Sequence, residues 1–229
     1  MSDLLIITPS RGRPQSIVRL LGAVHDLAEL ETGVYVGVDE DDPKRTDYEQ
    51  VFDRHRGPHD RLCISSPKGL AEWTNFAAKR HADRYPFLAS FGDDHLPRTR
   101  GFDRRLVRAI QDMGGTGFSY GYDAIREDVP EAWVQSSNVA KELGWMCPPG
   151  LKHFYIDNVI ADLGRWAGCI RYCRAVAVDH VHPAAGKAPS DPLYAKNFRK
   201  VEEDKKVYNE WRSTQMISDA RKICALKDR

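Results

Sequence analysis

The feature that most constrains this chain is a short apolar run that ends abruptly in charged residues. Residues 87–91 are apolar except for one serine, and they are followed directly by Gly92, Asp93, Asp94 and His95. Such a run predicts a buried strand, and the glycine marks the point where the chain leaves it. Ligands of open α/β sheets bind just beyond the carboxyl ends of the strands. The paired carboxylates therefore predict either a divalent metal that holds a substrate phosphate or a polar turn.

Composition places the chain among globular proteins. It has 229 residues, of which 41% are hydrophobic, enough for a domain with a real core. Lys and Arg number 34 against 33 Asp and Glu, a balance that argues against binding nucleic acid through a general positive field. No apolar run approaches the ~20 residues of a membrane span, and the first residues lack the features of a signal peptide. With five cysteines in no scaffold spacing, we expect reduced thiols and a soluble, cytoplasmic protein.

The apolar periodicity predicts an α/β fold with a mostly parallel central sheet flanked by helices. Expected strands are residues 4–8, 34–38, 61–64, 87–91, 118–122, 133–137, 170–172 and 176–178. Expected helices cover about 17–30, 71–83, 101–113, 138–143 and 157–166. The alternation of strands and helices in the first half is typical of parallel sheets. We divide the chain into a domain of residues 1–194 and a C-terminal helical extension, 195–229, whose single narrow apolar stripe packs on the outside.

Charged residues also follow the ends of the first two expected strands. The loop after the first strand carries Arg11 and Arg13, and Asp39 stands directly after the second. Asp39 is the expected functional acid, whereas we interpret residues 40–42 as a solvated loop. Arg11, Arg13 and Lys187 are candidates for pairing with phosphate oxygens, and Arg11 is the one we favour.

Two histidines stand at the end of the last expected strand. His180 and His182 are one residue apart, so in an extended segment they point to the same face. With His95 or a carboxylate nearby they could complete a metal site; the alternative is a polar strand end. Oxygen ligands with one imidazole suit Mg²⁺ or Mn²⁺. Cys169 and Cys173 lack the repeated spacing of a zinc site.

Asp157 opens an expected helix directly after aromatic residues. A partly desolvated carboxylate in that position is a candidate general base. The alternative is an acid that only favours the helix dipole and has no chemical role.

Taken in chain order, these motifs resemble a known class of enzymes. The motifs are residues 7–14, residues 38–42, Asp93-Asp94-His95, then Asp157 and the His180/His182 pair. The chain resembles nucleotide-sugar glycosyltransferases of the GT-A fold, most like those of family 2 and small enzymes of that kind encoded by bacteriophages. The resemblance covers roughly residues 4–194. A phage-encoded enzyme would act in the host cytoplasm.

The resemblance implies metal-dependent transfer of a sugar, of the hexosyltransferase type, from a nucleoside-diphosphate sugar to an acceptor hydroxyl. A UDP-sugar is the expected donor, and Mn²⁺ or Mg²⁺ the expected cofactor. The candidate donor-binding residues are Thr8, Pro9, Arg11, Asp39, Lys68, Asp93, Asp94 and Lys187. The candidate metal ligands are Asp94, His95, His180 and His182. Asp157 matches the base of inverting members, although Ile156 stands where the family carries an acid, and His95 stands at the third place of the acidic motif.

Two alternatives remain open at this point. A nucleotidyltransferase uses similar metal and phosphate chemistry, but usually carries a glycine-rich basic loop after the first strand, where this chain has a single glycine, Gly12. A non-catalytic module that binds a nucleotide or a sugar would explain the same acids without chemistry. The acceptor, whether protein, glycan or modified nucleic acid, and the stereochemistry of transfer are equally open.

Overall fold

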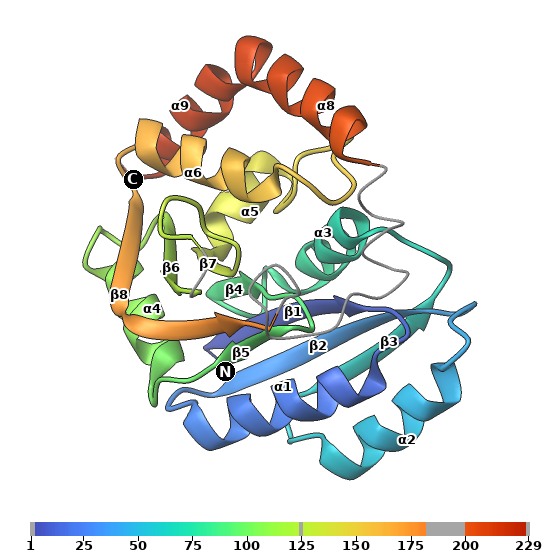
Figure 1. Cartoon of the computed structure of the whole chain (residues 1–229). Coiled ribbons are helices and arrows are strands. Elements are labelled where there is room, and N and C mark those ends of the chain that lie inside the picture. Colours follow the sequence, from blue (N-terminus) through green and yellow to red (C-terminus); the bar gives the residue numbers. More distant parts are fainter. Residues whose placement is uncertain (1–2, 124–125, 182–199, 228–229) are drawn as a thin grey trace.

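A mixed sheet runs through the centre of the molecule, with helices on both faces (Figure 1). The computed structural model describes residues 3–123, 126–181 and 200–227. Within them the strand order is β3-β2-β1-β4-β7-β6-β8-β5. The strands are β1 (Leu4–Ser10), β2 (Thr32–Asp39), β3 (Arg61–Ser65), β4 (Phe87–Ser90), β5 (His95–Pro97), β6 (Phe118–Tyr122), β7 (Trp133–Ser136) and β8 (Ile170–His180).

The helices form two layers around this sheet. They are α1 (Pro14–Leu27), α2 (Arg45–His55), α3 (Leu70–His81), α4 (Phe102–Gln111), α5 (Ser137–Leu143), α6 (Ile156–Trp166), α8 (Val201–Thr214) and α9 (Met216–Lys227). Leu4 and Ile6 of β1 face the cluster that includes α1, α2 and α4. Leu5 and Ile7 face the cluster that includes α3, α5 and α6. This alternation buries β1 on both faces, which explains why its first four residues are all apolar.

The first half of the sheet is entirely parallel. β3, β2, β1 and β4 pair side by side in the same direction. Their carboxyl ends therefore meet at one edge, where the loops after β1, β2 and β4 lie together. The predicted α/β fold is confirmed.

The second half mixes directions. β7 runs antiparallel to both β4 and β6, whereas β8 is parallel to β6 and antiparallel to β5. The two short strands expected at 170–172 and 176–178 are one strand, β8, with an irregularity opposite Gly121 and Tyr122. β5, which sequence analysis did not predict, starts at His95, directly after the paired carboxylates.

Two helices differ from expectation for local reasons. α1 begins at Pro14 rather than near Ile17, because the fixed φ of proline suits the first helical position. α2 was not predicted, since among its mostly polar residues only Tyr48 and Phe52, one turn apart, are buried.

The C-terminal helices α8 and α9 lie across α5 and α6, at the top of Figure 1. Trp211, Ala220 and Ile223 are buried in the same apolar cluster as Val159 and Leu163 of α6. The C-terminal helices are therefore part of the apolar core that lies between the sheet and α3, α5 and α6.

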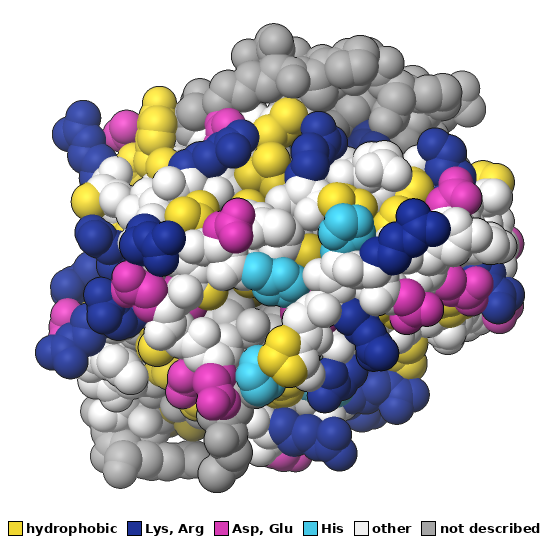
Figure 2. All heavy atoms as spheres, turned by 90° about the horizontal axis from the view of Figure 1, so that it is seen from below, with side chains coloured by type: hydrophobic (Ala, Val, Ile, Leu, Met, Phe, Trp, Pro, Cys, Tyr) yellow, Lys and Arg dark blue, Asp and Glu magenta, His cyan; other side chains and the backbone are white. Residues whose placement is uncertain are grey.

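On the face shown in Figure 2, acidic side chains lie among the lysines and arginines. The sequence has nearly equal numbers of the two charges, 34 Lys and Arg against 33 Asp and Glu. Among the helices that the structure describes, none has the length and apolarity needed to cross a membrane.

Candidate active site

A cavity of about 680 Å³ lies beyond the carboxyl ends of β1 and β4. The candidate residues that line it are Pro9, Arg11, Asp39, Lys68, Asp93, Asp94, His95, Asp157 and His180. Thr8 is buried in β1 and does not line the cavity. Lys187 and His182 lie outside the described residues.

Asp39 organises one end of the cavity. Its Oδ1 accepts hydrogen bonds from the backbone N–H of Lys68 at 2.9 Å and from Trp73 Nε1 at 2.8 Å. Its Oδ2 accepts one from Arg11 at 2.8 Å. The end of β2, the start of α3 and the loop after β1 are thereby tied to one carboxylate. This arrangement gives the end of the cavity a fixed shape, lined by the indole of Trp73.

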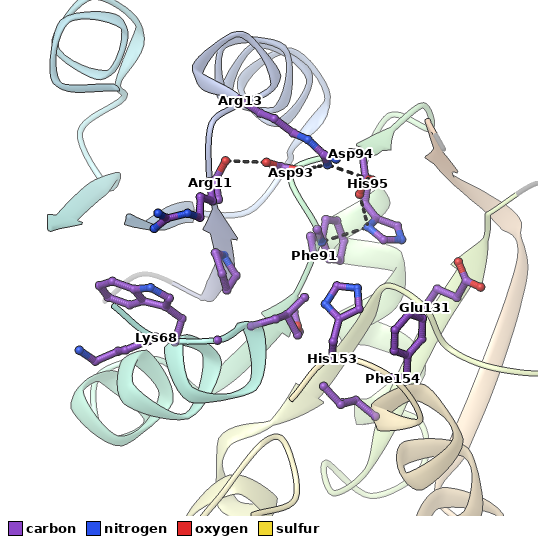
Figure 3. A pocket seen from close by; sticks show the side chains of 18 of the residues that line it. Arg11, Arg13, Lys68, Phe91, Asp93, Asp94, His95, Glu131, His153 and Phe154 are labelled. Carbon is purple, nitrogen blue, oxygen red and sulfur yellow. Dashed lines mark hydrogen bonds and ion pairs between the residues drawn. The ribbon is translucent and has the colours of Figure 1, made fainter. Parts of the chain in front are cut away.

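The two arginines of the first loop point in different directions (Figure 3). Arg11 binds Asp39 and, at 2.6 Å, Asp41, and the hydrogen bond to Asp41 is the main reason why its pKa lies even higher than usual. Arg13 reaches instead to Asp93 at 3.3 Å and to Asp94 at 3.8 Å. The cation beside the paired carboxylates is therefore Arg13. That Arg11 pairs with phosphate oxygens stays a prediction.

Of the three acids expected in a solvated loop after β2, Glu40 and Asp41 are exposed, and only Asp42 differs. Asp42 was expected in a solvated loop, but it is buried and accepts hydrogen bonds from the backbone N–H groups of Gly12 and Lys44, both at 2.7 Å. It fixes the loop that carries both arginines.

Asp93 is buried and connects β4 to the loop after β1. Ser10 Oγ donates to its Oδ2 at 2.5 Å, and the Ser10 hydroxyl in turn contacts the Tyr48 hydroxyl at 2.7 Å. Burial, and then the neighbouring charge of Asp94, raises the pKa of Asp93. Because the Asp93 carboxylate is already bound by Ser10 and Arg13, its main effect is to position Asp94 and the loop after β1.

Asp94, His95 and His180 form a second cluster at the opposite side of the cavity. His95 stands directly opposite His180 in the antiparallel β5–β8 pair, and their rings stack with centroids 4.1 Å apart. Asp94 Oδ2 lies 3.6 Å from His180 Nε2, and Asp94 Oδ1 lies 3.4 Å from His95 Nδ1. One candidate ligand atom from each of the three residues lies within 4.8 Å of the others.

Glu131, which sequence analysis missed, completes this cluster. Its Oε2 lies 2.5 Å from His180 Nδ1. Burial lowers the pKa of His180, but the hydrogen bonds and charges of Asp94 and Glu131 outweigh burial and raise the pKa to about 9. With Nδ1 held by a carboxylate, Nε2 faces Asp94. When this nitrogen gives up its proton it is free to bind a cation, the arrangement by which proteins orient a metal-binding histidine.

The candidate ligand atoms suit a divalent cation that binds both oxygen and nitrogen. One carboxylate and two imidazoles suit Mn²⁺ better than Mg²⁺, which prefers an all-oxygen shell. His95 Nδ1 accepts a hydrogen bond from the backbone N–H of Gly92 at 3.0 Å. Asp94 and His180 are therefore better placed as ligands than His95, which would have to exchange this bond for the metal.

Asp157 lies in the first turn of α6 and faces the same cavity. Burial is the main reason that its pKa is raised to about 6, and the charge of Glu131 adds to this effect. The residues before it, His153 and Phe154, form a neighbouring part of the wall (Figure 3). A carboxylate with this pKa is ionised at neutral pH and accepts a proton more readily than an exposed aspartate.

Comparison with known proteins gives a consistent fold. No protein-family model and no curated protein matches the chain. The structure is similar to S. aureus TarS 1-349 in complex with UDP, with a TM-score of 0.59 and 12% identity over 80% of this chain and 62% of that one. It is also similar to the mannosyltransferase PcManGT from Pyrobaculum calidifontis in complex with GDP-Man and Mn²⁺, with a TM-score of 0.65 and 13% identity over 89% and 64% of the two chains.

A third similar structure is glucosyl-3-phosphoglycerate synthase from Mycobacterium tuberculosis in complex with Mn²⁺, UDP and glucosyl-3-phosphoglycerate. It has a TM-score of 0.59 and 8% identity, over 86% of this chain and 75% of that one. This chain spans only about 60% of the length of the TarS 1-349 structures. At such low identities the likeness establishes the fold alone, which is the GT-A glycosyltransferase fold.

Proposed function

We propose that this protein is a metal-dependent glycosyltransferase that moves a sugar from a nucleoside-diphosphate sugar to an acceptor hydroxyl with inversion at the anomeric carbon. The observation that carries the proposal is one cavity with two chemically distinct ends. Asp94, His95 and His180 provide a cation site, and Asp157 provides a carboxylate with a raised pKa. Both lie at the carboxyl edge of a GT-A sheet.

The donor is proposed to lie along the edge of the sheet from Asp39 to Asp94. The base and ribose occupy the end lined by Trp73, Lys68 and Pro9, and the pyrophosphate lies by Arg13 and the cation site. UDP and GDP-Man are bound by structures of this fold, and we expect a UDP-sugar here.

Asp94 and His180 would hold Mn²⁺, and His95 or the donor itself would complete the shell. Bound there, the cation neutralises the charge that develops on the departing diphosphate. Arg13 adds a fixed positive charge from the other side of the paired carboxylates. Asp93 maintains the geometry through Ser10.

Asp157 would accept the proton of the acceptor hydroxyl. Its partial desolvation makes it a stronger base than a surface aspartate. For in-line displacement with inversion, the acceptor has to approach from the face of the sugar opposite the diphosphate. His153 and Phe154 form the wall on the Asp157 side and restrict water there.

Product analysis tests this function against its rivals. Incubation with Mn²⁺ and a panel of UDP- and GDP-sugars should release nucleoside diphosphate. Release of pyrophosphate would indicate a nucleotidyltransferase. Donor binding with neither product, across protein, glycan and nucleic-acid acceptors, would indicate a binding module and contradict the proposal.

A further inference from the structure

The helix that follows the sheet domain reaches the active site with one face. Lys200, Asp204 and Tyr208 are spaced four residues apart, so they lie on the same side of α8. Lys200 lines the cavity, and Tyr208 stacks on Tyr155 with ring centroids 5.2 Å apart. Asp204 lies between them.

The Asp204 carboxylate is fully buried and binds backbone N–H groups in the loop before α6. Its Oδ1 accepts a hydrogen bond from the N–H of Lys152 at 2.9 Å. Its Oδ2 accepts from the N–H groups of His153 at 2.9 Å and Phe154 at 2.8 Å. Three successive amides thus converge on one charge. Charge-assisted bonds of this kind are stronger than neutral ones, and buried amides that lose their acceptor are costly.

The loop that Asp204 holds is a wall of the cavity. His153, Phe154 and Tyr155 all line it. Tyr155 has a φ of 64°, a left-handed conformation that a tyrosine adopts only when its surroundings impose it. Asp157 follows two residues later. A shift of residues 152–155 would therefore move both the wall and the carboxylate.

We propose that Asp204 is a positioning residue for the transfer reaction: it fixes residues 152–155 from the C-terminal helix and, through them, sets Asp157 against the acceptor. This inference rests on the proposed glycosyltransferase function. It makes α8 a part of the active site rather than an external support.

Two variants and one matched control test the proposal. Asp204→Ala removes the acceptor, and Asp204→Asn keeps the shape but loses the charge. Asp219→Asn is the control, because Asp219 is also a buried acid of the C-terminal helices. It accepts hydrogen bonds from Trp211 Nε1 at 3.0 Å and Lys222 Nζ at 2.9 Å, both within α8 and α9, whereas Asp204 binds the loop before α6. Near-UV circular dichroism establishes that each variant is folded.

The first measurement is amide hydrogen exchange at residues 152–154. Protection should be lost in Asp204→Ala, reduced in Asp204→Asn and kept in Asp219→Asn. The second is steady-state kinetics with calorimetric donor binding. In Asp204→Ala kcat should fall by about 10-fold to 100-fold, because small displacements of reacting groups are costly, while donor affinity stays within about 3-fold, since the donor contacts come from the sheet edge. The kcat of Asp204→Asn should lie between that of Asp204→Ala and that of the wild type.

Wild-type kcat in a folded Asp204→Ala protein overturns the proposal, as does an equal loss of kcat in Asp219→Asn. Exchange and kinetics also separate this proposal from the proposed function. Unchanged protection at residues 152–154 in the Asp204 variants disproves the anchoring even if the enzyme transfers sugar. A wild-type protein that transfers no sugar from any donor disproves the function and the positioning role, although the exchange result still decides whether Asp204 holds the loop.

Discussion

The two sides of the cavity are built in different ways. The strand-end side, where we propose that the base and ribose of the donor bind, is formed by the ends of neighbouring parallel strands, β2, β1 and β4, held together by Asp39, Asp42 and Asp93. The other side is assembled from segments far apart in the chain: β5 against β8, the loop before α6, and α8. The strand-end side is a rigid edge of fixed geometry. The assembled side positions its candidate catalytic and metal-binding groups through contacts between distant segments, so its geometry depends on single residues such as Glu131 and Asp204.

Asp157→Asn should cause the largest loss on the assembled side. It keeps the shape but removes the base, so kcat should fall by ~10²–10⁴-fold. Donor affinity should hold, because Asp157 belongs neither to the proposed donor contacts at the strand ends nor to the proposed cation site. A stopped assay of nucleoside diphosphate release measures kcat, and calorimetric titration with the donor measures its affinity. Near-normal turnover, or a product with retained anomeric configuration, would exclude the role of base.

Glu131→Gln should weaken the cation site without removing a ligand. The carboxylate that orients His180 is replaced by an amide, and loss of such a partner typically lowers metal affinity by about 10–100-fold. Calorimetric titration with Mn²⁺ measures it. Asp112→Asn is a suitable control, because Asp112 is a surface acid that pairs with exposed Arg108 and does not line the cavity. Equal Mn²⁺ affinity in Glu131→Gln and the wild type would mean that Glu131 has no part in the site.

The pH dependence of kcat should follow Asp157. Its raised pKa is about 6, and only the ionised form accepts a proton. Below that pH kcat should therefore fall about tenfold per pH unit, and above it kcat should level off. A profile from about pH 5 to about pH 8 at saturating donor and metal tests this dependence. A rate that rises as the pH falls below 6 would contradict the assignment.

Tyr48→Phe should have the smallest effect, and it probes the strand-end side. The Tyr48 hydroxyl accepts from the N–H of Arg13 at 2.7 Å and contacts Ser10 at 2.7 Å. Its loss leaves a buried N–H without that acceptor, which should lower the free energy of unfolding by about 1–3 kcal/mol. Urea denaturation measures this change. Since Asp93 still holds the loop, kcat should change less than in Asp157→Asn; a larger loss would show that the strand-end side is not rigid.

The same contrast explains what the sequence could reveal. The ends of strands can be recognised in the sequence because apolar runs stop there at charged residues. The carboxyl edge of a parallel sheet then brings those residues together. Asp39, Asp93 and Asp94 were found in this way. Local pattern also located Asp157, through the aromatic residues and the helix that surround it.

The remaining site residues have no local signal. Glu131 acts on a histidine 49 positions away, and Asp204 stands in a charged segment where an acid is typical of a solvated face. β5 has only three residues, too few for a periodic pattern, so the register that sets His95 against His180 could not be derived. The direction of Arg11 and Arg13 depended on which acids the fold brought near them.

We propose above all that this cavity binds a nucleoside-diphosphate sugar through a divalent cation held by Asp94 and His180. The decisive experiment is calorimetric titration of the protein with UDP-sugars and GDP-sugars, in Mn²⁺ and then in chelator, with an Asp94→Ala, His180→Ala double variant as the comparison. At least one donor should bind saturably in Mn²⁺, and that binding should be lost both in chelator and in the folded double variant. Equal donor affinity under all three conditions would contradict it.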